Sequence, residues 1–131
     1  MTDIRRLGQI ILARVKDQVP ELEGRELDKA TETTAFPYVT RGPIYGADAD
    51  VECIEADDWT VQLDLWDRQS NKLKTAELAQ KVRRALKGWS DTAAVTMHPL
   101  SVGTPRIMDD PDGLTTHAVL MVEAMVEGDP G

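Results

Sequence analysis

The sequence predicts an α+β domain in which a single mostly antiparallel sheet of about four to five strands packs against two helices. Two segments, residues 3–18 and 71–87, repeat apolar side chains at helical spacing. Two further segments, 59–66 and 115–127, carry apolar side chains at every second position, as strands do. The 131 residues of the chain suit one domain. We therefore expect residues 1–131 to fold as a single unit.

The first expected helix covers residues 3–18. Its apolar side chains recur at intervals of three and four residues, at Ile4, Leu7, Ile11 and Val15. Thr2 or Asp3 can cap its start, and Pro20 marks its end. The polar stretch 20–36 that follows predicts an irregular connection.

The second expected helix covers residues 71–87, with Ser70 or Asn71 as its cap and Gly88 as its stop. Its apolar stripe consists of Leu78, Val82, Ala85, Leu86 and Trp89. Four cations lie in its C-terminal half, where they suit the helix dipole: Lys81, Arg83, Arg84 and Lys87.

A first strand is expected to begin at residues 36–40, where Pro37 suits an edge or the first position of a strand. Gly42-Pro43 and Gly46 predict a break after it. In the strand 59–66, one face carries Trp59, Val61, Leu63 and Leu65. We expect Trp59, Leu63 and Leu65 to be buried against the second helix.

The remaining strands are expected at residues 94–103, interrupted by Pro99, and at 105–109. The sequence Asp110-Pro111-Asp112-Gly113 is typical of a turn. The last strand, 115–127, has apolar residues on both faces, which predicts an inner strand covered by helices. The tail 128–131 is expected to be frayed.

Residues 42–58 form an arm that is unusually acidic. Between positions 47 and 58 it has no basic residue and six acidic residues: Asp48, Asp50, Glu52, Glu55, Asp57 and Asp58. Because like charges this dense repel one another, we expect a solvated loop or an extended hairpin arm that is mobile in the free subunit. A calcium loop is not expected, because Cys53 stands where such a loop needs glycine.

Charge and composition exclude several functional classes. The chain carries 15 basic and 23 acidic residues, a net charge of −8. This balance argues against a basic nucleic-acid binder and against binding to an anionic membrane surface. No apolar run approaches the length that spans a bilayer. The lone Cys53 allows no internal disulfide.

Few residues offer enzymatic chemistry. His98 and His117 lie in expected strands on either side of a turn, where they could be cross-strand neighbours in an acid–base or metal pair. The alternative is two separate strand histidines. Cys53 with a histidine could form a nucleophile and its base, although no third partner or oxyanion motif is visible. We expect no catalytic residue, no cofactor and no metal, and favour a binding or assembly role.

Several segments in order resemble a known family. They are the helix at 3–18, Gly24-Arg25-Glu26-Leu27, Phe36-Pro37-Tyr38-Val39, the strand from Trp59 to Asp67, the helix end Val82-Arg83-Arg84-Ala85-Leu86, and Asp110-Pro111-Asp112-Gly113 before Thr116-His117. This order resembles the small tail-completion proteins, or tail terminators, of long-tailed phages, prophages and gene-transfer-agent particles. Members of that family are similar in role to the tail terminator gpU of phage lambda.

The resemblance implies a structural protein of the virion or of a phage-like tail, made in the bacterial cytoplasm. It implies a homo-oligomeric ring, expected to be a hexamer, that caps the tail tube and stops its polymerisation. The implied partners are the major tail tube protein and the neck or stopper protein of the head, with DNA only in transit through the lumen. One alternative is a head-side neck or stopper protein, and another is a small hydrolase or metal enzyme using His98, His117 or Cys53. The acidic side chains of the arm are the candidate assembly interface.

Overall fold

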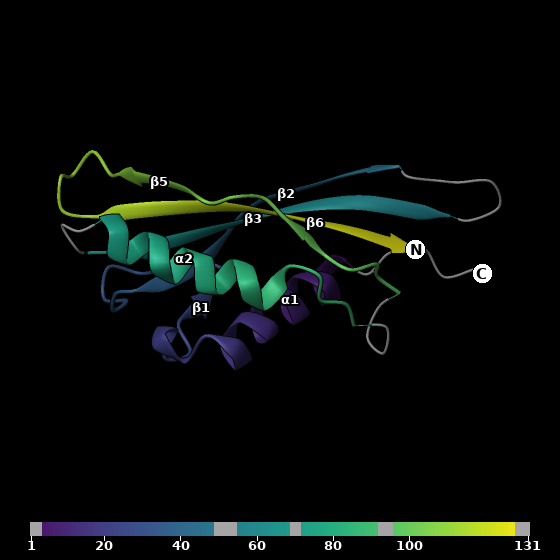
Figure 1. Ribbon diagram of the computed structural model, residues 1–131, viewed down its shortest axis with the longest axis horizontal. Coiled ribbons are helices and arrows are strands. Elements are labelled where there is room, and N and C mark those ends of the chain that lie inside the picture. The colour runs from purple at the N-terminus through teal and green to yellow at the C-terminus, as the bar shows by residue number, and fades with distance from the viewer. Residues whose placement is uncertain (1–3, 49–54, 69–71, 92–95, 128–131) are drawn as a thin grey trace.

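The computed structural model describes residues 4–48, 55–68, 72–91 and 96–127. Its elements in chain order are α1 (Ile4–Gln18), the 3-10 helix η1 (Pro20–Leu22), β1 (Glu26–Leu27), β2 (Tyr38–Asp48), β3 (Ala56–Asp67), α2 (Lys72–Leu86), β4 (Ser101–Val102), β5 (Arg106–Asp109) and β6 (Thr116–Glu127). Figure 1 shows two layers, with the sheet on one side and both long helices on the other. The expected α+β class is confirmed.

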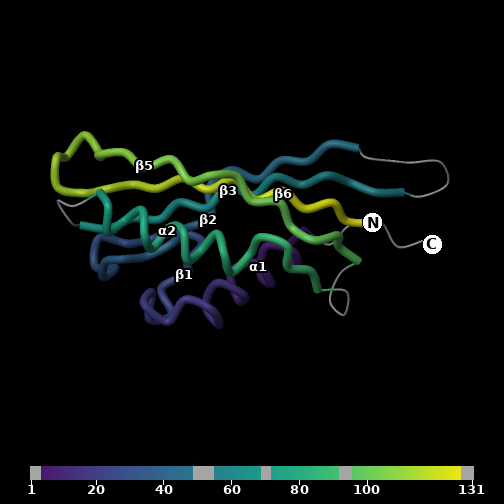
Figure 2. Tube along the Cα trace, viewed as in Figure 1, coloured from purple at the N-terminus to yellow at the C-terminus, as the bar shows by residue number. Residues whose placement is uncertain are grey.

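The sheet has six strands in the order β1-β2-β3-β6-β4, and β5 pairs with the same edge of β6 as β4 does. Strands β1 and β2 are parallel, whereas all other pairs are antiparallel. The long strands β3 and β6 pair along their whole length, from Ala56 opposite Glu127 to Asp67 opposite Thr116. The trace in Figure 2 follows these two strands across the molecule.

The hydrophobic core lies between the sheet and the helices. Val61, Leu63 and Leu65 of β3 are fully buried there, in one cluster with the α2 side chains Val82 and Leu86. Trp59 is half-buried and packs against the same cluster. The expected inward face of this strand is therefore confirmed for Leu63 and Leu65, and Trp59 lies at its margin.

Hydrogen bonds fix both helices in place. Arg14 of α1 donates from Nε to the carbonyl of Ala85 in α2 over 2.9 Å. The buried hydroxyls of Thr75 in α2 and Thr116 in β6 are 2.6 Å apart. Because Thr116 donates its own proton to the carbonyl of Asp67, Thr75 is the donor of the pair. Gly88 follows α2 at φ +81°, which is the expected helix stop.

The last strand is an inner strand covered by helices, as expected, but the helices cover only one of its two faces although both faces carry apolar residues. Strand β6 is an inner strand, but the two long helices lie on one face of the sheet only (Figure 1). Its core face is buried, from Thr116 to Val126. On the other face Val119, Met121 and Met125 are half-buried, because neighbouring strands shield their flanks.

The expected break at Gly42-Pro43 is wrong, because β2 continues through it to Asp48. The ladder with β3 shifts register between Arg41 and Ile44. Gly42 and Pro43 therefore form a bulge and do not end the strand. Glycine fits position 42 without displacing its neighbours, whereas an added Cβ would lie 2.5 Å from Asp64 Oδ2 and would force this carboxylate to shift. Backbone pairing beyond the bulge resumes with Ile44 opposite Val61.

The connection 20–36 contains more structure than expected. It holds η1 and the two-residue strand β1, which runs parallel to β2 and pairs Glu26 with Val39. The stretch expected as a strand at 94–103 is, in its described part, an isolated bridge at Met97 and the short β4. The proposed helix caps Thr2, Asp3, Ser70 and Asn71 and the tail 128–131 lie outside the described residues.

Candidate functional site

The acidic arm is the outer part of the β2–β3 hairpin. Residues 44–48 of β2 pair with residues 57–61 of β3, so that Asp48 lies opposite Asp57 and Ala47 opposite Asp58. We call these ten residues the acidic hairpin. Of the two forms that the sequence allowed, an extended hairpin arm is therefore confirmed over these positions. Glu55 is exposed just before β3, whereas Asp50 and Glu52 lie outside the described residues.

Cross-strand packing holds this hairpin together despite its like charges. Gly46 lies opposite Trp59, and a Cβ at Gly46 would approach the indole to 2.8 Å. The glycine therefore lets the ring lie over the neighbouring strand, where the sequence had indicated a break. Ile44 and Tyr45 remain 41% and 56% exposed, which leaves two large apolar side chains on the hairpin surface. Exposed apolar groups beside charges are typical of a protein contact surface.

A polar cluster occupies the sheet face away from the helices. His117 Nε2 lies 2.8 Å from Asp64 Oδ1, and the Gln62 amide donates to the same oxygen over 2.9 Å. The Trp66 indole N–H donates to the Thr40 hydroxyl over 3.2 Å. Asp64 is only 7% exposed, so both donors satisfy a carboxylate that is nearly removed from water.

The two histidines lie near opposite ends of β6. His117 is opposite Trp66, whereas His98 donates its backbone N–H to Met125 and places its ring 3.2 Å from Glu127. The cross-strand pair is therefore not formed, and the two histidines are separate. Only His117 lies in a strand, because His98 follows an isolated bridge at Met97 and precedes β4. Among the described residues no group of three His, Cys, Asp or Glu side chains could hold a metal ion. Cys53 lies outside the described residues.

The turn before β6 is stabilised by Asp112. Its carboxylate accepts from the backbone N–H of Leu114 and of Thr115 and from the Thr115 hydroxyl, at 2.8, 2.9 and 2.7 Å. The hydroxyl contact and the backbone donors hold the pKa of Asp112 below its usual value. Gly113 takes φ +72° in this turn. The aspartates here have a structural role in the turn, as expected.

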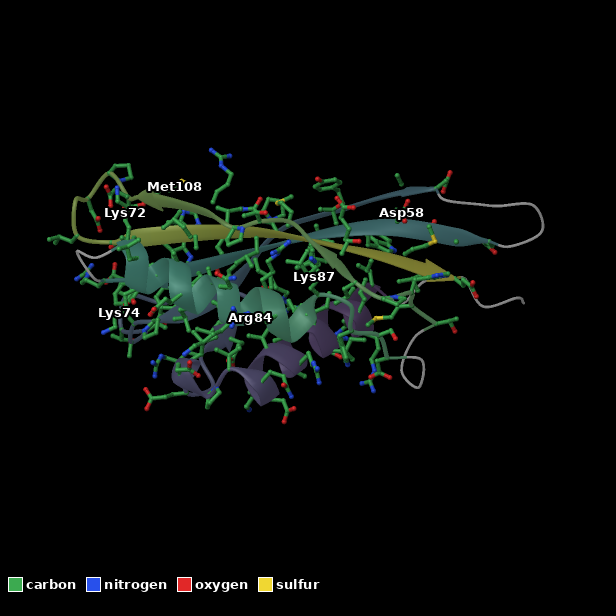
Figure 3. All side chains as sticks on the ribbon, viewed as in Figure 1. Asp58, Lys72, Lys74, Arg84, Lys87 and Met108 are labelled. Carbon is green, nitrogen blue, oxygen red and sulfur yellow. The ribbon has the colours of Figure 1, made fainter. Side chains whose placement is uncertain are left out.

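Charge is unevenly distributed between the two long helices and the rest of the chain. Helices α1 and α2 carry nine Lys or Arg side chains and two Asp or Glu side chains. The whole chain has 15 basic and 23 acidic residues, so the remaining segments hold six basic and 21 acidic ones. Figure 3 labels Lys74 and Arg84 on the helix side of the sheet and Asp58 on the opposite side. Sequence reasoning treated the cations of α2 only as dipole partners and missed this division.

Comparison with known proteins assigns the chain. The family model described as Tail completion protein gp17 matches residues 9–127. The chain belongs to this family. No curated protein sequence matches it. One solved structure with the same fold is a chain of the "Virion of native gene transfer agent (GTA) particle", at 17% identity and a TM-score of 0.76, and the match covers 90% of this chain and 92% of that chain.

This tail completion protein is therefore a component of a phage-like tail, and the family expected from the order of its segments is confirmed. A structural tail completion family implies a protein without enzymatic activity. No described helix is long and apolar enough to cross a membrane. The described part of the chain offers three surfaces that a protein contact could use: the acidic hairpin, the side formed by α1 and α2, which we call the cationic helix side, and the face of the sheet away from these helices.

Proposed function

We propose that this tail completion protein is the tail terminator of its particle. Copies of the chain form a ring, expected to be hexameric, on the last ring of the tail tube. The ring stops polymerisation of the major tail tube protein and presents a surface to the neck or stopper protein of the head. The match to the tail completion family over residues 9–127 carries the proposal. A protein of the same fold in a gene transfer agent virion supports it.

A closed ring requires two different contact surfaces on each subunit, because each copy binds its neighbours head to tail. The cationic helix side and the acidic hairpin meet this requirement. The excess of acidic residues also suits a channel through which DNA slides without being gripped, because phosphates and carboxylates repel.

The proposed assembly interface is the acidic arm, which contacts the adjacent subunit or the last ring of the tail tube. Its side chains are Asp48, Asp50, Glu52, Glu55, Asp57 and Asp58. In the described part of the arm, these carboxylates accompany the exposed Ile44 and Tyr45. The arm supplies little of the core, so its surface can change without loss of the fold.

Electron microscopy of particles made without this protein tests the proposal. A terminator defect leaves tails of uncontrolled length. Tails of uniform length beside heads that leak DNA would instead identify a head-side stopper. Counting copies in intact particles gives a second readout, since a ring needs several copies per tail and a single copy would exclude it.

Variants of the arm test the proposed interface. Replacing Asp48, Asp50 and Glu52 with Ser should leave the subunit folded and impair tail termination. The matched control replaces three exposed acidic residues outside the arm and outside α2, Asp17, Glu32 and Glu123, with Ser, which removes the same charge. Normal infectious or transducing particles from the arm variant would show that the arm is not an interface. Uniform tails that join heads poorly would place the arm on the neck-facing side.

A further inference from the structure

One side of helix α2 presents a row of cations. Lys74, Lys81 and Arg84 of α2 and Lys87 directly after it are all exposed, and we call these four residues the cationic α2 face. Glu77 is the one acidic residue of α2 and lies between Lys74 and Lys81. Helix α2 has 15 residues, which corresponds to a length of about 22 Å. Lys81 forms an ion pair with Glu21. Within the described part of the chain, Arg84 and Lys87 have no ion-pair partner, so their charges are available to another molecule.

The acidic hairpin has matching dimensions and the opposite charge. Its paired section is five residues long on each strand, or about 16 Å. Asp48, Asp57 and Asp58 supply three carboxylates, and the ten hairpin residues include no base. Figure 1 shows that this end of β2 and β3 extends past the helices. The hairpin is held in the sheet, so it cannot fold back onto the α2 of its own chain.

We propose that the acidic hairpin of one copy binds the cationic α2 face of the next copy, an inference that rests on the ring under Proposed function. Opposite charges on two separate surfaces of one chain favour a head-to-tail contact, which is the contact that a ring repeats. A symmetric contact of hairpin with hairpin would bring carboxylates together and is disfavoured. Ile44 and Tyr45 on the hairpin and Leu73 beside the cationic α2 face, which is 76% exposed, add apolar contact area.

Charge exchange tests the contact. One variant carries Arg84→Glu and Lys87→Glu, and a second carries Asp48→Lys and Asp58→Lys. Both are expressed in cells that lack the natural copy, and tails are scored by electron microscopy. Each variant alone should give at least about tenfold fewer tails of uniform length, because every contact in the ring then joins like charges.

The two variants expressed together should restore uniform tails. In a ring where the two variants alternate, every second contact joins the natural hairpin to the natural cationic α2 face. The other contacts join the hairpin with Asp48→Lys and Asp58→Lys to the face with Arg84→Glu and Lys87→Glu, so all contacts are attractive. A chain that carries all four substitutions should also terminate tails. The matched control for the glutamate variant, Lys29→Glu with Arg106→Glu, makes the same charge change at exposed positions outside the hairpin and both long helices and should behave like the natural chain. Thermal unfolding of each purified variant verifies that it is folded.

The outcomes separate this contact from the proposed function. If the natural chain does not terminate tails, the terminator role fails. If the natural chain terminates tails, and the glutamate variant or the lysine variant alone also does so, the proposed contact is wrong. If both variants fail and neither the mixture nor the fourfold variant restores tails, the two surfaces bind other partners and the contact is again wrong. Loss of duplex DNA binding by the Arg84→Glu, Lys87→Glu variant would then assign the cationic α2 face to DNA.

Crosslinking shows the direction of the contact. With Cys53→Ser removing the natural thiol, Asp58→Cys and Arg84→Cys on one chain should give a ladder of covalent oligomers in assembled tails when treated with a bifunctional maleimide. A chain with only one of the two cysteines should stay monomeric. Dimers from the Asp58→Cys chain alone would indicate a symmetric hairpin contact and overturn the proposal.

Discussion

The indole of Trp66 lies flat against the imidazole of His117, with ring centroids 3.8 Å apart and ring planes 9° apart. The two residues are directly opposite in the β3–β6 ladder. His117 also contacts Asp64, two residues before Trp66 on β3, so that one side chain connects two cross-strand neighbours. The stack therefore orders the sheet face that no long helix covers, with a polar pair nearly withdrawn from water.

Replacing His117 with Ala should lower the free energy of unfolding by about 1–3 kcal/mol, because it removes a buried hydrogen bond and an aromatic stack. Urea unfolding measures the change. The matched control is His98→Ala, since the His98 side chain is 49% exposed and pairs with Glu127 at the protein surface. That pair should contribute no more than about 1 kcal/mol. Equal losses in the two variants would contradict the structural role of the His117 cluster.

Gly42→Ala should destabilise the fold by about 1–3 kcal/mol, because the new Cβ would displace the Asp64 carboxylate. Gly103→Ala is the matched control, since nothing lies within 4 Å of a Cβ there. Gly42→Ala and His117→Ala both disturb Asp64. The double variant should therefore lose less free energy of unfolding than the sum of the losses in the two single variants. Strict additivity in a double-mutant cycle would show that the bulge and the histidine are independent.

Leu63→Ala should cost about 2–5 kcal/mol, because Leu63 is fully buried between the sheet and α2. Leu73→Ala deletes the same atoms at a side chain that is 76% exposed. It should change the free energy of unfolding by no more than about 0.5 kcal/mol. A Leu63→Ala variant as stable as the Leu73→Ala variant would mean that the inward face of β3 is assigned wrongly.

The spacing of apolar residues in the sequence predicted the buried faces of the long strands and helices. Leu63 is one of several apolar residues at alternate positions of a long strand, and such periodicity identifies a buried face without any knowledge of the partner strand. The two-residue β1 is too short to show a period, and its pairing depends on where β2 lies. The bulge at Gly42 was mistaken for a break because glycine and proline have the same local signature in both.

Features that join distant segments could not be predicted in this way. The contact between Asp64 and His117 spans 53 residues, and only the register of β3 with β6 brings the two side chains together. The division of charge likewise depends on both helices lying on the same side of the sheet. The net charge of −8 is a sum over the whole chain, so it does not show that the two helices carry an excess of basic residues.

The buried carboxyl group of Asp67 makes stability depend on pH. Asp67 is 5% exposed, and burial raises the pKa of its side chain above the usual 3.8. The folded state therefore binds this proton more tightly than the unfolded state does. The contribution of Asp67 to stability is fully present below the unfolded pKa. It falls as the pH rises through the raised pKa, because the charged form must then be kept away from water.

Asp67→Asn should therefore be more stable than the natural chain at pH 7, and its advantage should shrink as the pH approaches the unfolded pKa. Urea unfolding of both proteins at several pH values measures this difference, in which the other carboxylates cancel. Asp112→Asn is a control of opposite sign, because hydrogen bonds lower the pKa of Asp112 and stabilise its charged form. Its loss of stability should be largest at neutral pH and should disappear in acid. An Asp67→Asn advantage that grows in acid would contradict the proposed cost of burying this carboxylate.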